Sequence, residues 1–360
     1  MIFTLSFDLI RGNYVLLIHY FSTILRTIRH ILIILAVCNS MNYYGQKSDS
    51  VKHELFKNRV VLFADLGFNS APFNIQDNYL LGVSKLDYKN NIRAVLGIGG
   101  AYKWFALRIG FALPGNLRSK SEFGNTEYFD IGLRFNIKQT FSNIIIRSYK
   151  GYALKNAYQW NDTLNLEKPN AIMPNVSSTS ISANVWYFIS KEFKMQAVDG
   201  KVGHYTGAAK TWYFKTSLNL FGISNDTSPL VPEELRDSTN DRHHASSIGA
   251  IDLGLIPGYV YVNRIKNWQF AVFAGLGGVI QSKFYTKGQT SRGYLGIAPR
   301  IDIRLIAGYT KPKYFIMLTS DFDIKSLQIQ NLKYNQTYYN LKLVAGIRLH
   351  TKKSRQKDWI

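Results

Sequence analysis

The chain has 360 residues, of which 14% are aromatic, 27 are glycine and one is cysteine. Its mean hydropathy of -0.11 is too low for a membrane protein built of helices, and the single cysteine excludes an internal disulfide, a zinc finger and a thiol-redox centre. The net charge of +21 does not point to nucleic acid, because the basic residues are spread singly and cluster at 352–357 alone.

Residues 1–45 have the character of a targeting segment. Two arginines precede a short apolar run at 31–37, and small or turn-prone residues then lead to Gly45 and Gln46. Positive residues, an apolar stretch of about 7–15 residues and a small residue before the cut describe a secretory signal. We therefore expect cleavage near Gly45/Gln46.

Two alternatives exist for this N-terminal region. A membrane anchor over 14–37 would contain Arg26, Arg29 and His30, which are costly at the middle of a bilayer. A lipoprotein cleavage at Cys38 would place a valine where a small residue is expected. No later stretch approaches 18 uncharged apolar residues, so no transmembrane helix is predicted after the signal.

Beyond residue 57 the sequence alternates with a period of two. Between 297 and 309 the odd positions are mostly apolar, whereas the even positions include Arg300, Asp302 and Arg304. Successive side chains of a strand point to opposite faces, so this pattern predicts strands with one apolar face. Twelve strands are predicted, near 58–69, 92–102, 104–113, 126–137, 141–153, 178–190, 209–222, 248–263, 267–285, 295–309, 313–325 and 336–350.

The connections between these strands differ in length on the two sides. Those after strands two, four, eight and ten are very short, whereas those after strands one, three, five, seven, nine and eleven are longer and polar. This asymmetry is typical of an outer-membrane barrel, whose short turns face the periplasm. The connection at 191–208 breaks the pattern and could be a periplasmic excursion, an inward plug or two further short strands.

The predicted fold is a single all-β, antiparallel, up-and-down transmembrane β-barrel of about 12 strands (10–14) over residues 58–350. A signal segment at 1–45 and a short periplasmic lead at 46–57 precede it, and a basic tail at 351–360 follows. A soluble β-sandwich that acts as a secreted binding module is the alternative fold. Seven aromatic residues near strand ends are candidates for interfacial girdles: Trp104, Tyr128, Tyr187, Trp212, Trp268, Tyr309 and Tyr339.

Several short segments, taken in order, resemble a known family. They are AYKWFAL at 101–107, EYFD at 127–130, RSYKGY at 147–152 and PGY at 257–259, together with the Tyr44-Gly45-Gln46 processing site. Over about residues 50–350 the chain resembles Bacteroidota-type outer-membrane barrels that are catalogued as a domain of unknown function. The resemblance implies a barrel in the outer membrane and carries no catalytic residues. Such barrels commonly end on an aromatic residue, whereas this chain continues to Ile360.

If the apolar faces meet lipid, the opposite faces line the lumen. The candidate lumen charges are Arg108, Arg134, Lys215, Arg300, Arg304, Lys342 and Arg348 against Asp130, Asp252 and Asp302. The favoured interpretation is a filled barrel whose interior charges pair with one another. The alternative is a channel for small anionic solutes, since fixed positive charge in the lumen favours anions.

An outer-membrane barrel enzyme that acts on lipid or surface peptide is a further alternative. His204, His243 and His244 are the candidate histidines, but no spacing among them identifies a catalytic triad or a metal pair. We assign no catalytic, cofactor or metal residues and expect no cofactor. The expected function is structural or transport-related, with membrane lipid, lipopolysaccharide and the barrel-assembly machinery as partners; adhesion or assembly through the long outer loops is a third possibility.

Overall fold

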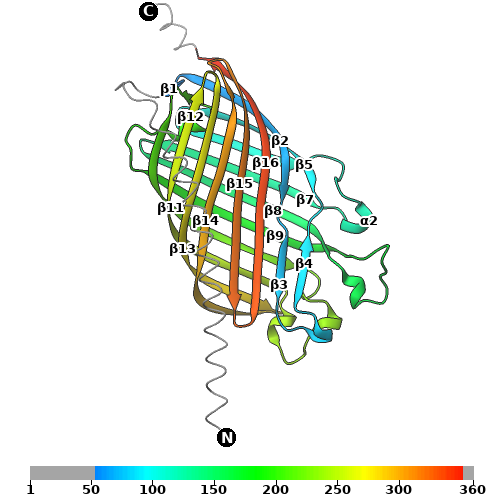
Figure 1. Cartoon of the computed structure of the whole chain (residues 1–360). Helices are drawn as coiled ribbons and strands as arrows, with labels where there is room; N and C mark the ends of the chain where they lie inside the picture. The colour runs from blue at the N-terminus through cyan, green and yellow to red at the C-terminus, as the bar shows by residue number, and fades with distance from the viewer. Residues whose placement is uncertain (1–52, 352–360) are drawn as a thin grey trace, which may run out of the picture. The chain divides into compact units, whose positions relative to one another are not determined.

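Antiparallel strands make up most of the computed structural model, which describes residues 53–351 (Figure 1). The ring closes where Ile347 of the last strand lies opposite Leu62 of the first. Its twelve strands are β2 (Arg59–Ser70), β5 (Arg93–Tyr102), β6 (Phe105–Ala112), β7 (Glu127–Ile137), β8 (Thr140–Leu154), β9 (Ala171–Phe188), β11 (Ala209–Asn225), β12 (Ser247–Ile265), β13 (Trp268–Lys287), β14 (Thr290–Thr310), β15 (Tyr314–Ile329) and β16 (Leu332–His350).

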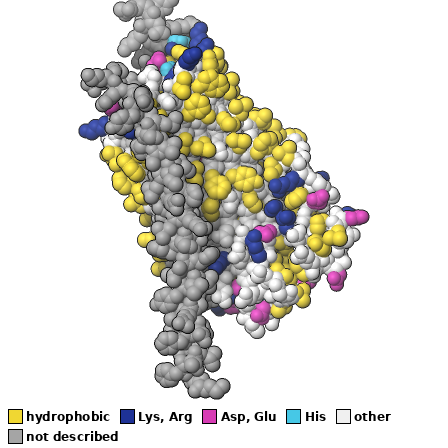
Figure 2. Space-filling model, viewed as in Figure 1, with side chains coloured by type: hydrophobic (Ala, Val, Ile, Leu, Met, Phe, Trp, Pro, Cys, Tyr) yellow, Lys and Arg dark blue, Asp and Glu magenta, His cyan; other side chains and the backbone are white. Residues whose placement is uncertain are grey.

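Period-two alternation gives each strand a lipid face and a lumen face. On β15, Ile316 and Leu318 are 45% and 43% exposed, whereas Phe315 and Met317 are 1% exposed. Figure 2 shows that such hydrophobic side chains cover much of the visible wall, while charged side chains gather at the upper end and towards the loops on the lower right. A band of this kind belongs in a bilayer. The predicted transmembrane barrel is confirmed, and the soluble β-sandwich is wrong because the sheet closes on itself.

Aromatic side chains mark one membrane interface. Trp104, Tyr187, Trp212 and Trp268 are each about half exposed, and all lie at the end of the barrel that carries the short turns. We call this the inner end; the first barrel strand begins there and the last one finishes there. The expectation that Tyr128 belongs to such a girdle is wrong, since its side chain is buried on the lumen face.

The wall is uneven in height. The wall strands from β8 to β16 have 15 to 21 residues, β10 not being part of the wall, whereas β5, β6 and β7 have 8 to 11, close to the roughly 9–11 needed to cross a bilayer. The hairpin of β3 (Phe73–Gln76) and β4 (Lys85–Lys89) fills the gap beyond these short strands. It pairs with β16 on one side and with β8 on the other, and so restores the wall at the outer end.

Two of the predicted outer loops are absent. The strands β13 and β14 stay paired as far as Lys287 and Thr290, and β15 and β16 as far as Ile329 and Leu332. The prediction of longer loops after the ninth and eleventh strands is therefore wrong. Above the membrane both faces of a strand can be polar, so the apolar alternation stops before the strand does.

The connection at 189–208 is an inward plug, one of the three alternatives that its length left open. It folds into the lumen as a plug that contains α3 (Met195–Val198) and β10 (Gly203–Tyr205), and β10 pairs with β1 (His53–Leu55). We call residues 189–208 the inner plug. The remaining short elements are η2 (Leu80–Gly82), α2 (Lys120–Phe123), η3 (Ala157–Gln159), η4 (Glu233–Leu235) and η5 (Asp241–His244).

Between residues 53 and 351 no helix has the length and apolar character to span a membrane. The expected signal segment and its cleavage position, including Cys38, lie outside the described residues, as does nearly all of the basic tail. The domain limits drawn from the sequence stay predictions.

Candidate functional site: the lumen

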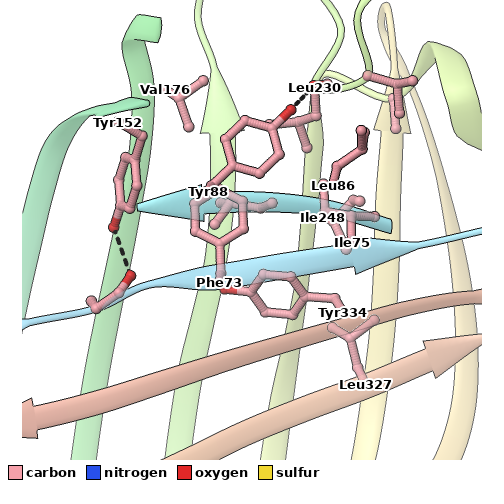
Figure 3. Close-up of a cluster of buried hydrophobic side chains, with 14 of the residues drawn as sticks. Phe73, Ile75, Leu86, Tyr88, Tyr152, Val176, Leu230, Ile248, Leu327 and Tyr334 are labelled. Carbon is pink, nitrogen blue, oxygen red and sulfur yellow. Dashed lines mark hydrogen bonds between the residues drawn. The ribbon is translucent and has the colours of Figure 1, made fainter. Parts of the chain in front are cut away.

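Apolar side chains fill the lumen at its outer end. They come from the β3–β4 hairpin, the loop at 226–246 and the surrounding wall. Figure 3 shows this outer cluster, in which Phe73 stacks on Tyr88 with ring centroids 4.6 Å apart, and the Tyr88 hydroxyl donates to the carbonyl of Leu230. The labelled members are Phe73, Ile75, Leu86, Tyr88, Tyr152, Val176, Leu230, Ile248, Leu327 and Tyr334.

A buried polar clasp ties the outer loops together. Asp77, beyond β3, accepts from Arg242 at 3.4 Å and lies 3.5 Å from Nε2 of His243. The backbone N–H of Asp237 donates to Nδ1 of His243 at 3.0 Å, so that nitrogen carries no proton. Burial lowers the pKa of His243 below its ordinary value, although the nearby Asp77 carboxylate opposes this. The fully buried, neutral imidazole therefore links the outer loops and has a structural role.

The middle of the lumen is polar. Its charged side chains lie between the outer cluster and the inner plug, on the inward faces of the strands or on the plug itself. We call this set the polar layer. It contains nine cations (Arg108, Arg134, Arg147, Lys201, Lys215, Arg300, Arg304, Lys325 and Lys342) and seven carboxylates (Asp65, Asp130, Asp199, Asp252, Asp302, Asp321 and Asp323).

Arg108 is the centre of one buried network. Its guanidinium forms two hydrogen bonds to Asp65, at 2.6 and 2.7 Å, and a further one to Asp130. Tyr128 donates to the other oxygen of Asp130 at 2.8 Å. A Cβ at Gly97 would lie 2.4 Å from both the Arg108 and the Asp65 side chains, so glycine is required there for close approach.

Asp302 is the centre of a second network. It accepts hydrogen bonds from Lys215 at 2.9 Å, from the Tyr213 hydroxyl at 2.8 Å and from the Trp186 indole at 3.2 Å. Charge-assisted hydrogen bonds of this kind offset the cost of burying an ion. Four more pairs complete the layer: Arg300–Asp252, Arg304–Asp321, Arg134–Asp199 and Lys325–Asp323.

In addition to the Arg134–Asp199 pair, side chains of the wall hold the inner plug by hydrogen bonds to its backbone. Gln269, fully buried on β13, donates to the carbonyls of Ala197 and Val198 at 2.8 and 2.7 Å and accepts from the N–H of Tyr205 at 2.8 Å. Arg348 on β16 donates to the carbonyls of Gly200 and Lys201. These contacts satisfy backbone groups that the short α3 and β10 leave without partners.

Apolar side chains of the inner plug and of the wall pack together and close the lumen at its inner end. We call this set the inner cluster; it includes Phe63, Phe141, Trp186, Phe193, Met195, Val198, Tyr213, Phe273, Phe315 and Val344. Val344 faces inwards and belongs to the inner cluster, which explains why this position on the lumen face is apolar. Outside this closure lies a groove of about 370 Å³ whose floor is Phe188 and Met195 and whose rim carries Lys57, Lys103, Lys138 and Lys194.

Little open space lies within the polar layer. Two adjoining cavities have volumes of about 60 and 40 Å³ and share the side chains of Asn143, Ile145, Arg147 and Asp321. At roughly 10–15 Å³ per water, together they hold a handful of water molecules. The described lumen is thus a filled interior, with apolar ends and a charged middle.

The structure places nine of the ten predicted lumen charges in the polar layer. The tenth, Arg348, lies at the inner plug. Sequence reasoning missed seven charged residues of the layer: Asp65, Arg147, Asp199, Lys201, Asp321, Asp323 and Lys325. Four of these are carboxylates, so the lumen is much closer to neutral than the predicted ratio of seven cations to three carboxylates.

The three candidate histidines do not come together. His204 lies in the inner plug, with Nε2 3.2 Å from a carboxylate oxygen of Glu54, whereas His243 and His244 lie in η5 at the outer end. Burial and the positive charges of Arg264 and Arg348 lower the pKa of His204 to about 4. Within residues 53–351 no group of three His, Cys, Asp or Glu side chains is arranged to hold a metal ion.

Solved structures with a similar arrangement of strands are outer-membrane proteins. The outer membrane protease OmpT from Escherichia coli is 9% identical over 82% of this chain and 98% of its own, with a TM-score of 0.37. An outer membrane channel from Pseudomonas putida F1 is 13% identical over 84% and 100%, with a TM-score of 0.34. The translocator domain of the autotransporter NalP from Neisseria meningitidis is 10% identical over 92% and 98%, with a TM-score of 0.29. At these scores no activity is carried over.

No curated protein matches the sequence. One family model does, and it extends over residues 47–348, from before β1 almost to the end of β16. The match bears out the resemblance drawn from the short segments between 101 and 259. The chain belongs to the family described as a domain of unknown function, DUF4421.

Proposed function

We propose that this protein is an outer-membrane β-barrel that is closed in its resting state and serves a structural role in the membrane. The observation that supports this best is the occlusion of the lumen by the outer cluster, the paired polar layer and the inner plug. An open pore needs a continuous hydrated path, and here both ends are filled by close-packed apolar side chains.

The lipid face and the predicted targeting segment support an outer-membrane location. A lipid-facing barrel with short turns at one end is characteristic of the outer membrane, with those turns in the periplasm. We expect export with cleavage near Gly45/Gln46, insertion by the barrel-assembly machinery and contact with lipopolysaccharide at the outer end. The Bacteroidota-type origin rests on the sequence resemblance.

Planar-bilayer recording tests the closed state. Purified, folded protein should give no stepwise conductance, whereas an open barrel of twelve strands would conduct as soon as it inserts. Folding is checked on the same sample by heat-modifiable migration, since a folded barrel migrates faster before boiling. Membrane location is checked by fractionation, and the mature terminus by sequencing. Steady conductance from folded wild-type protein contradicts the proposal.

A gated conduit for small anionic solutes is the second candidate. The observation that favours it is that the inner closure is a separate segment, held by Gln269 and Arg348 through hydrogen bonds to its backbone. A segment attached in this way can leave the lumen without breaking the ring. Transport would still require the outer cluster to open, and the combined variant described in the Discussion tests that requirement.

The geometry gives little support to an enzyme. His243 is fully buried within the outer loops, and His204 is buried in the inner plug, so neither can reach a substrate in this state. Replacement of His204, His243 and His244 by glutamine should leave any lipid or protease activity of the purified protein unchanged. Loss of such an activity on replacement would revive the enzymatic alternative.

A further inference from the structure

Three cations of the polar layer form no ion pair with the described residues. Arg147 comes from β8, Lys342 from β16 and Lys201 from the inner plug, and all three line the same cavity of about 40 Å³. Lys201 lies over the ring of Phe63, with Nζ 4.2 Å from the centroid, and Arg147 lies 5.9 Å from that of Tyr338. Among the residues that the structure describes, none offers such an aromatic contact to Lys342. Cation–π contacts of this kind compensate a buried charge in part.

The charge around this cavity does not balance. Its lining includes Arg108 and Arg134 in addition to these three cations, and two carboxylates, Asp130 and Asp321. The charged partners of the lining residues add Asp65, Asp199 and Arg304. The lining residues and their ion-pair partners thus comprise six cations and four carboxylates, in a space walled by protein and lipid where water screens charge poorly.

A polar side chain with unused hydrogen-bonding capacity also faces this space. Asn143 is 2% exposed and lines both cavities, and its Oδ1 has no hydrogen-bond partner among the described residues. The two ends of an amide are assigned from their partners, so a 180° turn exchanges the Oδ1 acceptor and the NH₂ donor. The lining of the cavity thus combines an amide with unused hydrogen-bonding capacity and an excess of positive charge.

We propose that the cavity between Arg147, Lys201 and Lys342 binds a small monovalent anion, of which a halide such as chloride fits best. The volume of about 40 Å³ corresponds to roughly three waters, so a monatomic anion fits together with one or two waters. Because Arg147 and Lys342 come from facing parts of the wall and Lys201 from the inner plug, the anion joins the plug to the barrel. This role is independent of whether the barrel ever conducts.

Crystals grown in bromide provide the direct test. Full-length mature protein is refolded from urea in sodium gluconate, whose anion is too large for the cavity, and is then transferred to sodium bromide. The proposal expects an anomalous peak in the cavity beside Lys342. Absence of a peak there, or peaks confined to the surface, overturns it.

A solution measurement gives a second, independent readout. The temperature at which half of the protein loses its fast-migrating folded form is followed as chloride replaces gluconate at constant ionic strength. The midpoint should rise and then saturate, as ligand binding to the folded state requires. In Lys342→Met the half-saturating chloride concentration should increase at least tenfold; in the control Lys333→Met, an exposed side chain near the outer turn, it should not change.

Lys201→Met is a second variant in case Lys342→Met fails to fold, because Lys201 lies in the inner plug and not on a strand of the barrel wall. It should weaken the chloride response in the same way and should lose the bromide peak. A wild-type midpoint that is equal in chloride and gluconate, or a cavity peak that persists in these variants, overturns the assignment. Either outcome leaves the bilayer test of the closed barrel unaffected, so the two proposals can fail separately.

Discussion

Replacement of Gln269 by leucine should release the inner plug while leaving the ring intact. Leucine is close in size but makes none of the three hydrogen bonds that Gln269 forms with Ala197, Val198 and Tyr205. These three residues are at most 1% exposed, so two carbonyls and one N–H lose their partners in the interior. Each buried group left without a partner costs about 1–3 kcal/mol.

The sum is at least about 3 kcal/mol, and it acts on the plugged state alone because a displaced plug has its backbone in water. Since every 1.4 kcal/mol is tenfold, the population with the plug displaced should rise roughly 100-fold. Proteolysis follows that population when opening and closing are fast. Lys201, which is 6% exposed, provides the trypsin site that reports on it.

The assay is the rate of trypsin cleavage after Lys201 in folded protein. Gln281→Leu is the matched control, because Gln281 is equally buried on the same strand but donates to Ser326 of the wall. It should lower the stability of the barrel without exposing Lys201. If Gln269→Leu is cut no faster than the wild type while remaining folded, these hydrogen bonds do not retain the plug.

Three further predictions concern the charged middle, the plug and the lipid face. Arg108→Met leaves Asp65 and Asp130 buried without their cation and should lower the free energy of unfolding in urea by about 3–5 kcal/mol. In the folded protein the pKa of His204 is about 4, against 6.5 ordinarily, so the folded state favours the neutral imidazole. Stability should therefore be full above pH 6.5 and should fall towards pH 4 by an amount on the order of 2 kcal/mol. His204→Leu should abolish this loss in the same urea titrations. Ile303→Lys, on the lipid face, should cost about 2–4 kcal/mol in vesicles and little in detergent.

The sequence predicted the wall of the barrel well because lipid imposes one rule on every strand. Each outward position that crosses the bilayer must be apolar, so alternation appears wherever the inward face is small or polar. The inward face follows no such rule. On β2 it reads Val61 and Phe63 against the inner plug and then Asp65 in the polar layer, so both faces look apolar at first and the aspartate was missed.

On β15 the same change of polarity occurs twice. Phe315 and Met317 pack in the inner cluster, Asp321 and Asp323 lie in the polar layer, and Leu327 belongs to the outer cluster. An inward face that is apolar at both ends and charged in the middle is the pattern of a filled barrel. The predicted strand at 313–325 already contained the charged middle of this pattern, Asp321 and Asp323. The packing partners came from 189–208 and 226–246, which have no strand period, so their place in the lumen could not be read from periodicity.

The lumen is closed at both ends, and this arrangement predicts how mutations affect conduction. The inner plug and the outer cluster are built from different segments and meet across the polar layer, so release of one leaves the other closed. Gln269→Leu alone should therefore stay silent in planar bilayers.

Replacement of the loop at 226–246 by a two-residue turn, which removes Leu230 and Leu235 from the outer cluster, should also stay silent. The two changes together should give stepwise currents that favour anions, because the polar layer keeps its excess of positive charge. Conductance in either single variant would show that one closure is no seal. Silence of the folded double variant, with Lys201 open to trypsin, would show that the paired charges of the polar layer themselves block the lumen.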